Sequence, residues 1–125
     1  MKPEMGDSET AEYQYIVHVG NNGYADRLWR MFALGSVVLL VDTGWEEFYY
    51  SLLQPHRHYI PVRQDSSNLC EQLEWVRSHS AEAELIASRG REFIQKCLSI
   101  DFVNLYVAEV ARQIGYLWEL GHSRV

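Results

Sequence analysis

The chain has 125 residues and a formal net charge of −6, and 47% of its residues are hydrophobic. This length suits one domain with its own core, and the composition excludes an intrinsically disordered chain. The acidic balance argues against a general nucleic-acid-binding protein, because such a protein needs a basic surface. A bound anion would therefore need a local cluster of hydrogen-bond donors.

The beginning of the chain and its two cysteines add few constraints. Residues 1–12 are polar and acidic, and we expect a flexible lead-in without an apolar stretch of signal-peptide length. The longest apolar run, FALGSVVLLV, is too short to span a bilayer. Cys70 and Cys97 are too few for a disulfide framework. Both fall in expected helices, where a cysteine is most often buried.

The first half of the chain reads as strand, helix and strand. Residues 13–19 (YQYIVHV) are β-branched and aromatic, which predicts a strand, and a glycine-containing turn follows at 20–23. Apolar residues recur at helical spacing from Tyr24 to about Leu34, with Gly35 suited to the helix C-cap. Residues 36–41 (SVVLLV) form a continuous apolar run, typical of a strand buried on both faces of a parallel sheet.

The second half of the chain becomes mostly helical. Residues 42–53 (DTGWEEFYYSLL) predict a turn and a short helix, and 58–62 (HYIPV) predict a third strand, which Pro61 puts at an edge or an end. Residues 69–79, 81–98 and 101–120 show helical periodicity, with Asp101 as the expected N-cap of the last helix. We therefore predict one domain over residues 13–122 after the lead-in at 1–12.

Strands that alternate with helices predict an α/β fold with right-handed crossovers and a Rossmann-like parallel sheet flanked by helices. Such sheets bind ligands at the carboxyl ends of their strands. The turn at residues 20–23 and the acidic residues after the second strand both follow such ends. We therefore expect a ligand site at this edge.

Arg27 is the first candidate site residue. It falls in the first turn of an expected helix, where a cation is locally unfavourable because the helix N-terminus is already partly positive. The turn before it can present free backbone N–H groups to an anion such as a pyrophosphate, and Arg27 can then bind a phosphate with two hydrogen bonds. The alternative is a solvated surface arginine after a simple glycine turn. Asp26 is more simply explained as a stabilising first-turn carboxylate.

Glu46 and Glu47 follow the second strand and are candidates to accept hydrogen bonds from ribose hydroxyls. Taken alone, they are better explained as favourable charge in the first turn of a short helix. His56 and His58 are two potential metal ligands, but the sequence offers no obvious third ligand, so a surface at the start of the strand is favoured over a metal site. No nucleophile motif or Walker motif is present.

Taken together, these segments resemble the CAP10-type glycosyltransferases, which include the protein O-glucosyltransferases and the fungal capsule-associated xylosyltransferases. The resemblance covers about residues 13–120. It is carried by Arg27 after the glycine turn, followed in order by ALGSVVL, EEFYY, LLQPHRHYIPV and LEWVRSH. No single piece is diagnostic, but the ordered set over this length is specific.

The resemblance implies the C-terminal half of a GT-B glycosyltransferase that transfers glucose or xylose from UDP-glucose or UDP-xylose to a protein or glycan hydroxyl. It implies no bound metal or other cofactor, and a place in the secretory pathway, in the endoplasmic reticulum lumen or the Golgi. The donor-binding loop then falls on Asn22, Gly23, Tyr24, Ala25, Asp26 and Arg27, with Arg27 as the diphosphate clamp.

The sequence departs from the family pattern at several points. Ala25 stands where serine is common, and QPHRHY stands where KPWVHY is usual. The acceptor-binding half and its acidic general base precede this segment in the family. We therefore expect UDP-sugar binding with little or no transfer by this chain alone. The alternative is a non-catalytic module that has lost or changed the nucleotide site and pairs with a partner or with itself. An unrelated α/β hydrolase is disfavoured, because no catalytic constellation is present.

Overall fold

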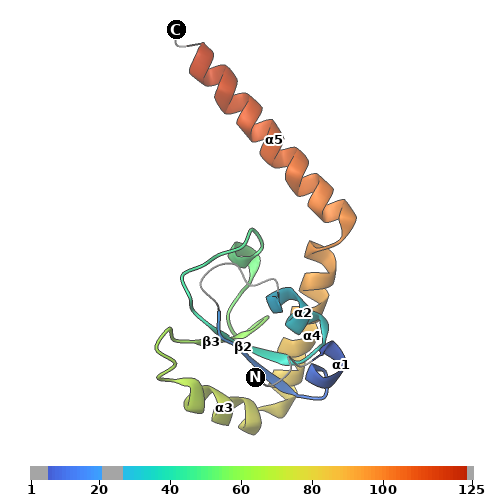
Figure 1. The fold of residues 1–125 in the computed structure, drawn as a ribbon, viewed down its shortest axis with the longest axis vertical. Helices are drawn as coiled ribbons and strands as arrows, with labels where there is room; N and C mark the ends of the chain where they lie inside the picture. Colours follow the sequence, from blue (N-terminus) through green and yellow to red (C-terminus); the bar gives the residue numbers. More distant parts are fainter. Residues whose placement is uncertain (1–5, 21–26, 124–125) are drawn as a thin grey trace. The chain divides into compact units, whose positions relative to one another are not determined.

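The computed structural model of the chain describes residues 6–20 and 27–123 (Figure 1). The chain divides into two compact units, Met1–Ile94 and Gln95–Val125. The helices and strands, in chain order, are α1 (Asp7–Thr10), β1 (Tyr15–His18), α2 (Arg27–Ala33), β2 (Val37–Val41), the 3-10 helix η1 (Tyr50–Leu52), β3 (Ile60–Val62), α3 (Leu69–Ser78), α4 (Ser80–Cys97) and α5 (Ile100–His122).

The first unit contains a parallel sheet of three strands in the order β1-β2-β3. Tyr15 pairs with Val37 at one end of the sheet, and Val41 pairs with Val62 at the other. The central strand β2 is almost entirely buried, as its unbroken apolar run predicts. Helices flank the sheet, so the predicted α/β fold with a Rossmann-like parallel sheet is confirmed.

The core forms where β2 and β3 meet helices α3 and α4. Leu39 of β2 and Ile60 of β3 are fully buried, and they share one apolar cluster with Val76 of α3 and Ile86 of α4. Burying a side chain of this size contributes roughly 1.5–3 kcal/mol. These helices hold the strand ends in place, and the loops that follow the strands start from a rigid frame.

The predicted strands are found at their expected places, each somewhat shorter than the sequence suggested. Pro61 lies in the edge strand β3, as its missing N–H requires. Helix α2 is described from Arg27, and residues 24–26 of the predicted helix lie outside the described residues. Gly35 follows α2 with φ +82°, the left-handed backbone that favours glycine after a helix.

Three local predictions are wrong. The short helix predicted within residues 42–53 is a single 3-10 turn, Tyr50–Leu52, so Glu46 and Glu47 precede it and lie in no helical first turn. Ser99, rather than Asp101, caps α5, since its Oγ accepts a hydrogen bond from the Phe102 N–H at 3.2 Å. A short helix, α1, lies within residues 1–12, and the flexible lead-in expected there stays a prediction. Cys70 is exposed, although a buried cysteine was expected.

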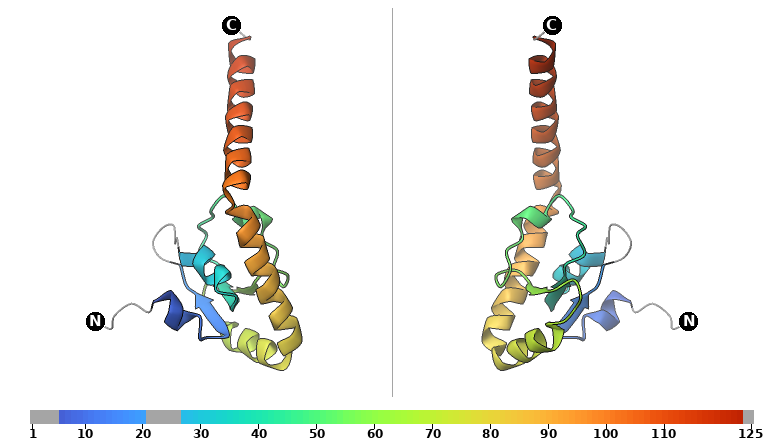
Figure 2. Two further views of the ribbon diagram at one scale, coloured as in Figure 1. Left: turned by 90° about the vertical axis from the view of Figure 1, so that its right-hand side faces the viewer. Right: turned by 90° about the vertical axis from the view of Figure 1, so that its left-hand side faces the viewer.

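The second unit consists mainly of α5, a continuous helix of 23 residues (Figure 2). None of its residues is buried. Among the helices of the described residues, none combines the length and the hydrophobicity needed to cross a membrane. The prediction of one domain over residues 13–122 stays a prediction.

Candidate functional site

The carboxyl ends of the three parallel strands lie at one edge of the sheet. β1 ends at His18, β2 at Val41 and β3 at Val62. The backbone N–H of Asp42 donates to the carbonyl oxygen of Val62 at 3.0 Å, which extends the pairing of β2 and β3 past the strand end. The loops that leave this edge therefore start side by side, where α/β sheets bind their ligands.

The loop after β1 packs directly on the loop after β2. A Cβ atom added to Gly20 would overlap the methyl group of Thr43 and lie 3.0 Å from the Thr43 Cβ. Only a glycine allows this close approach. The predicted donor-loop residues Asn22, Gly23, Tyr24, Ala25 and Asp26 lie outside the described residues. Gly20 fixes where that loop begins, and Arg27 marks where it ends.

Arg27 is the first residue of α2 and is exposed. Its positive charge acts on His18, which is buried at the end of β1 with 2% of its surface exposed. Burial lowers the pKa of His18 from its ordinary value, and the nearby charge of Arg27 lowers it further. Arg27 therefore lies near the carboxyl end of β1, as the sequence predicts.

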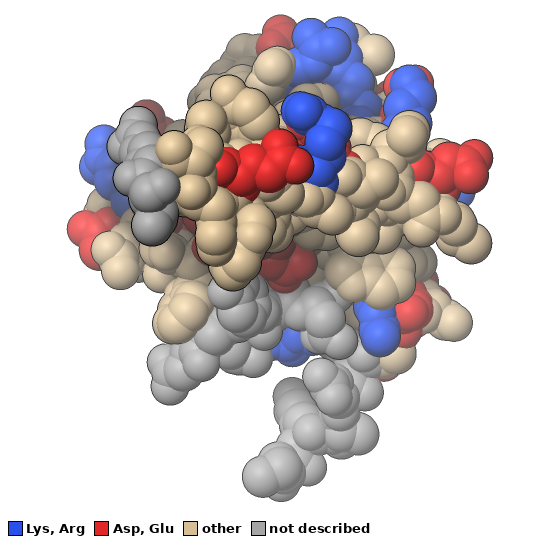
Figure 3. All heavy atoms as spheres, turned by 90° about the horizontal axis from the view of Figure 1, so that it is seen from above, with Lys and Arg blue, Asp and Glu red and all other residues tan. Residues whose placement is uncertain are grey.

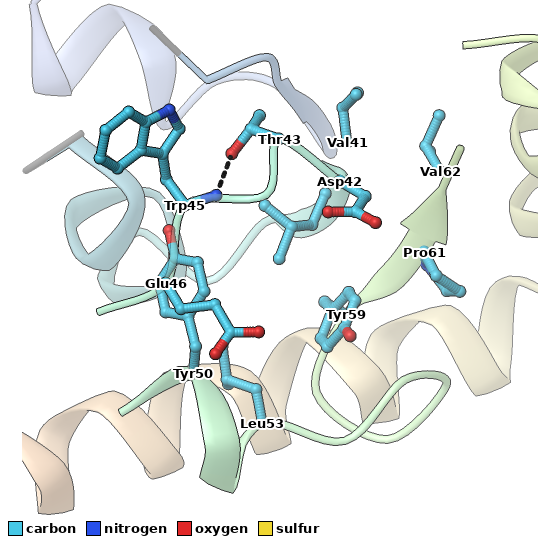
Figure 4. A pocket seen from close by; sticks show the side chains of 11 residues that line it. Val41, Asp42, Thr43, Trp45, Glu46, Tyr50, Leu53, Tyr59, Pro61 and Val62 are labelled. Carbon is cyan, nitrogen blue, oxygen red and sulfur yellow. Dashed lines mark hydrogen bonds between the residues drawn. The ribbon is translucent and has the colours of Figure 1, made fainter. Parts of the chain in front are cut away.

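A pocket of about 290 Å³ opens at the ends of β2 and β3 (Figure 4). Two carboxylates, those of Asp42 and Glu46, line it together with the aromatic side chains of Trp45, Tyr50 and Tyr59. Arg27 does not line this pocket. Arg27 therefore lies near the end of β1, whereas the pocket lies at the ends of β2 and β3 and is lined by carboxylates and aromatic side chains.

Local hydrogen bonds shape the loop that carries Glu46. The N–H of Gly44 donates to Oδ1 of Asp42 at 3.0 Å, and Gly44 has φ +74°. The N–H of Trp45 donates to Oγ1 of Thr43 at 3.4 Å (Figure 4). This turn is typical of Asp and Thr side chains that bond to the backbone two residues on. It directs Trp45 and Glu46 into the pocket wall.

The two candidate glutamates have different environments. Glu46 lines the pocket, whereas Glu47 does not. The charge of Glu47 acts instead on two neighbouring phenols, and it adds to burial in raising the pKa of Tyr49 and of Tyr50, the latter to about 12. The structure thus favours Glu46 over Glu47 as a ligand-binding carboxylate.

The pocket chemistry suits a ligand with hydroxyl groups. Burial, followed by the charge of Asp42, raises the pKa of Tyr59, and Tyr50 also titrates far above neutrality. Both phenols stay protonated at neutral pH and can donate hydrogen bonds, while the carboxylates of Asp42 and Glu46 accept them. Two carboxylates repel a phosphate, so an anionic group fits better near Arg27.

The sequence analysis missed Asp42, Tyr50 and Tyr59 as site residues. Asp42 directly follows the buried strand β2, which is a signal that could have found it. Tyr59 precedes β3 and lines the pocket although it does not follow the end of a strand, so no spacing rule would have found it.

The histidines after residue 55 have structural partners. Nδ1 of the buried His58 accepts a hydrogen bond from the Gln54 N–H at 2.9 Å, and the ring of His56 packs edge-on against Trp75. Within residues 6–20 and 27–123, no three His, Cys, Asp or Glu side chains gather in a way that could hold a metal ion. The PHRHY segment therefore gives no support to a metal site.

Charged side chains of both signs are interspersed among uncharged ones on the face drawn in Figure 3. A net charge of −6 does not favour the collection of anions by the chain as a whole. An anionic ligand therefore depends on local donors, such as Arg27 and the backbone N–H groups at the start of α2.

Residues 3–120 match glycosyl transferase family 90. The chain belongs to this family. The match includes every strand of the sheet and most of α5, and it confirms the resemblance to the CAP10-type enzymes. Membership of a glycosyl transferase family implies a sugar donor and an acceptor as substrates.

Several relatives are identical to this family 90 chain at about two fifths of the aligned residues. Protein O-glucosyltransferase 1 of Homo sapiens is 37% identical over 95 residues, which cover 76% of this chain and 24% of that protein. Protein O-glucosyltransferase 2 of Danio rerio is 39% identical over 95 residues, covering 76% and 19%. The uncharacterized protein 027R of Frog virus 3 is 41% identical over 93 residues, covering 70% and 10%. The chain thus spans a quarter or less of these relatives.

Proposed function

We propose that this family 90 chain is the donor-binding part of a UDP-sugar-dependent glycosyltransferase, the C-terminal half of a GT-B enzyme. The observation that carries the proposal is the arrangement of Arg27 near the end of β1 and of the Asp42 and Glu46 carboxylates at the ends of β2 and β3. A nucleotide sugar has the matching chemistry, because it joins a diphosphate to two hydroxyl-bearing rings. Two of the relatives above are named protein O-glucosyltransferases, which supports transfer of glucose to a protein hydroxyl. Transfer of xylose, or transfer to a glycan, rests on the resemblance to the CAP10-type enzymes alone.

In this proposal, each part of the donor has its own protein partner. Arg27 and the loop Asn22–Asp26 hold the diphosphate, and Glu46 accepts hydrogen bonds from hydroxyl groups in the pocket. When the bond to the sugar breaks, negative charge grows on the departing UDP. Arg27 and the partial positive charge at the start of α2 stabilise that charge. The acceptor site and the general base are supplied from outside this chain.

The experiment that tests the proposal is isothermal titration of UDP into the chain and into Arg27→Ala. Loss of a charge-assisted hydrogen bond to a phosphate should weaken binding by about 10-fold or more. Arg30→Ala is the matched control, because Arg30 is exposed on the same helix and its guanidinium lies 5.4 Å from the Trp29 ring centroid. Equal UDP affinity in wild type and Arg27→Ala would contradict the proposed clamp.

The proposal further includes a donor site without a metal ion and a place in the secretory pathway. We expect UDP binding to be unchanged by a metal chelator, since the diphosphate charge is balanced by Arg27 and not by a metal ion. By its likeness to the protein O-glucosyltransferases, the whole enzyme is expected in the secretory pathway. A fall in UDP affinity after chelation would contradict the metal-free donor site.

A second candidate function is a non-catalytic nucleotide-binding or protein-interaction module. The observation that favours it is Ala25 in the predicted donor-binding loop, where the family commonly has serine. A transfer assay with UDP-glucose or UDP-xylose and a protein acceptor distinguishes the two when it is run on the chain together with its remaining enzyme parts. Turnover would exclude the second candidate.

A further inference from the structure

Thr43 contacts both loops of the proposed donor site. On one side its side chain packs on Gly20, where an added Cβ atom would overlap the Thr43 methyl group and lie 3.1 Å from Oγ1. On the other side, Oγ1 accepts a hydrogen bond from the Trp45 N–H at 3.4 Å (Figure 4). Thr43 therefore joins the start of the loop that leads to Arg27 to the loop that carries Glu46.

Packing, rather than sheet pairing, determines how closely these two loops approach. The register of β1 and β2 ends with the pair His18 and Leu40. Beyond this pair, the contact of Gly20 with Thr43 joins the two loops. Protein interiors are packed so closely that a change of one methyl group at such a contact is felt. The size of the side chain at position 43 therefore affects the distance between the loops.

The proposed donor makes this distance important. In the proposed function, Arg27 at the end of the first loop holds the diphosphate, and Glu46 on the second loop accepts hydrogen bonds from hydroxyl groups. In UDP, one short covalent link joins the diphosphate to the hydroxyl-bearing ribose, so the two parts have little freedom to adjust. Joining two ligand parts increases affinity only where both protein sites can be occupied at once.

We propose that Thr43 is a positioning residue whose methyl group sets the spacing between the diphosphate site at Arg27 and the hydroxyl-binding pocket at Glu46. Thr43 acts through the two loops, and this role requires no contact between Thr43 and the donor. A β-branched side chain suits the role because it is stiff at χ1, so its methyl group and its hydroxyl keep fixed directions. The role rests on the proposed function, because it needs a ligand that reaches both sites.

The test compares three ligands: UDP, which reaches both sites, and inorganic pyrophosphate and uridine, which each reach one. Thr43→Ser keeps the hydroxyl and removes the methyl group. Its UDP affinity should fall by about 10-fold, a part of the roughly 100-fold or more that linked binding can contribute. The affinities for pyrophosphate and uridine, measured by NMR titration, should each change by less than about twofold, because each fragment depends on one loop alone. A purely structural defect would weaken all three ligands together.

Two further variants serve as matched controls. Thr43→Val keeps the branched shape and a methyl group and loses only the Oγ1 acceptor, so it should retain most of the UDP affinity. Gly20→Ala/Thr43→Ser moves one methyl group from the second loop to the first, and it should bind UDP more tightly than either single variant. The comparison of Thr43→Ser with Thr43→Val decides the question even where Gly20→Ala alone does not fold.

The outcomes separate this role from the proposed function. Thr43→Ser with the UDP affinity of the wild type, or with pyrophosphate and uridine weakened as much as UDP, would overturn the positioning role. Either result would leave the Arg27 clamp in place, because Arg27→Ala tests that clamp separately. A wild-type chain that does not bind UDP, or that binds it equally well after Arg27→Ala, would overturn the proposed function and the role of Thr43 with it.

Discussion

The guanidinium of Arg27 lies close enough to the buried imidazole of His18 to lower the pKa of that side chain. The two residues come from different elements, the start of α2 and the end of β1. The relationship is informative because both burial and a neighbouring cation act in the same direction on His18. His18 is neutral at physiological pH, and it responds to whatever changes the charge around Arg27.

The first prediction is that His18 reports on anion binding. In Arg27→Gln the pKa of His18 should rise, because the cation that disfavours the imidazolium is gone, while burial still holds it below 6.5. Saturating UDP should also raise the pKa of His18 in the wild type, since a bound diphosphate brings negative charge to Arg27. NMR titration of the histidine ring protons measures both changes. An unchanged His18 pKa in UDP would place the diphosphate elsewhere.

The second prediction concerns the pH dependence of stability. The pKa of His18 is lowered on folding, so below about pH 6.5 the unfolded chain binds a proton that the folded chain does not. The free energy of unfolding should therefore fall as pH drops from 7 to 5. His58, whose pKa burial also lowers, acts in the same direction. Urea unfolding of His18→Gln should show a shallower decline than wild type, and an equally steep decline would contradict this account.

The third prediction tests the contact between the loops after β1 and β2. Gly20→Ala should lower the free energy of unfolding by about 1–3 kcal/mol, the usual cost of overpacking, because the new methyl group overlaps the Thr43 side chain. Thr43→Ser removes the overlapped methyl group and should restore part of the loss in the double variant. Gly6→Ala is the control, as no atom lies within 4 Å of its added Cβ. Urea unfolding measures the free energy of unfolding of the wild type, Gly20→Ala, Gly20→Ala/Thr43→Ser and Gly6→Ala. A double variant no more stable than Gly20→Ala would contradict the contact.

The fourth prediction separates the two glutamates. Glu46→Gln should weaken UDP binding by about 5- to 10-fold, as expected for losing roughly 1 kcal/mol of hydrogen bonding to hydroxyl groups. Glu47→Gln is the matched control, because Glu47 lies outside the pocket and should leave UDP affinity within about twofold of wild type. Titration calorimetry measures both affinities. A larger loss in Glu47→Gln than in Glu46→Gln would reverse the assignment.

The sheet could be predicted because burial leaves a clear pattern in the sequence. β2 is covered on both faces, so its residues form an unbroken apolar run, and Pro61 limits β3 to an edge. The place of Arg27 at the carboxyl end of β1 follows from the strand–turn–helix order alone. These features depend on local rules that the fold does not override.

The pocket could be predicted only in part, because it depends on turn geometry. The turn at Asp42–Trp45 is held by two side chain-to-backbone hydrogen bonds, and it decides which neighbouring glutamate enters the pocket. Sequence spacing treats Glu46 and Glu47 alike. Tyr59 joins the site from before the next strand, which requires the register of β2 and β3 to be known.

The start of α5 gives the last prediction. Ser99 and Asp101 are both suitable capping residues by type, and the sequence favoured Asp101. In the structure, Oγ of Ser99 accepts from the Phe102 N–H, while Asp101 is already inside the first turn. Ser99→Ala should therefore destabilise the helix start by about 1 kcal/mol, the typical cost of losing a cap.

Asp101→Asn is the control for the Ser99 prediction. It removes only a favourable first-turn charge, which is expected to cost a few tenths of a kcal/mol. Amide hydrogen exchange in the first turn of α5 measures both effects, because it reports local opening even where the rest of the chain stays folded. Faster exchange in Asp101→Asn than in Ser99→Ala would indicate that Asp101, and not Ser99, caps the helix. The order expected here follows from the hydrogen bond at 3.2 Å, which Ser99 makes from outside the helix.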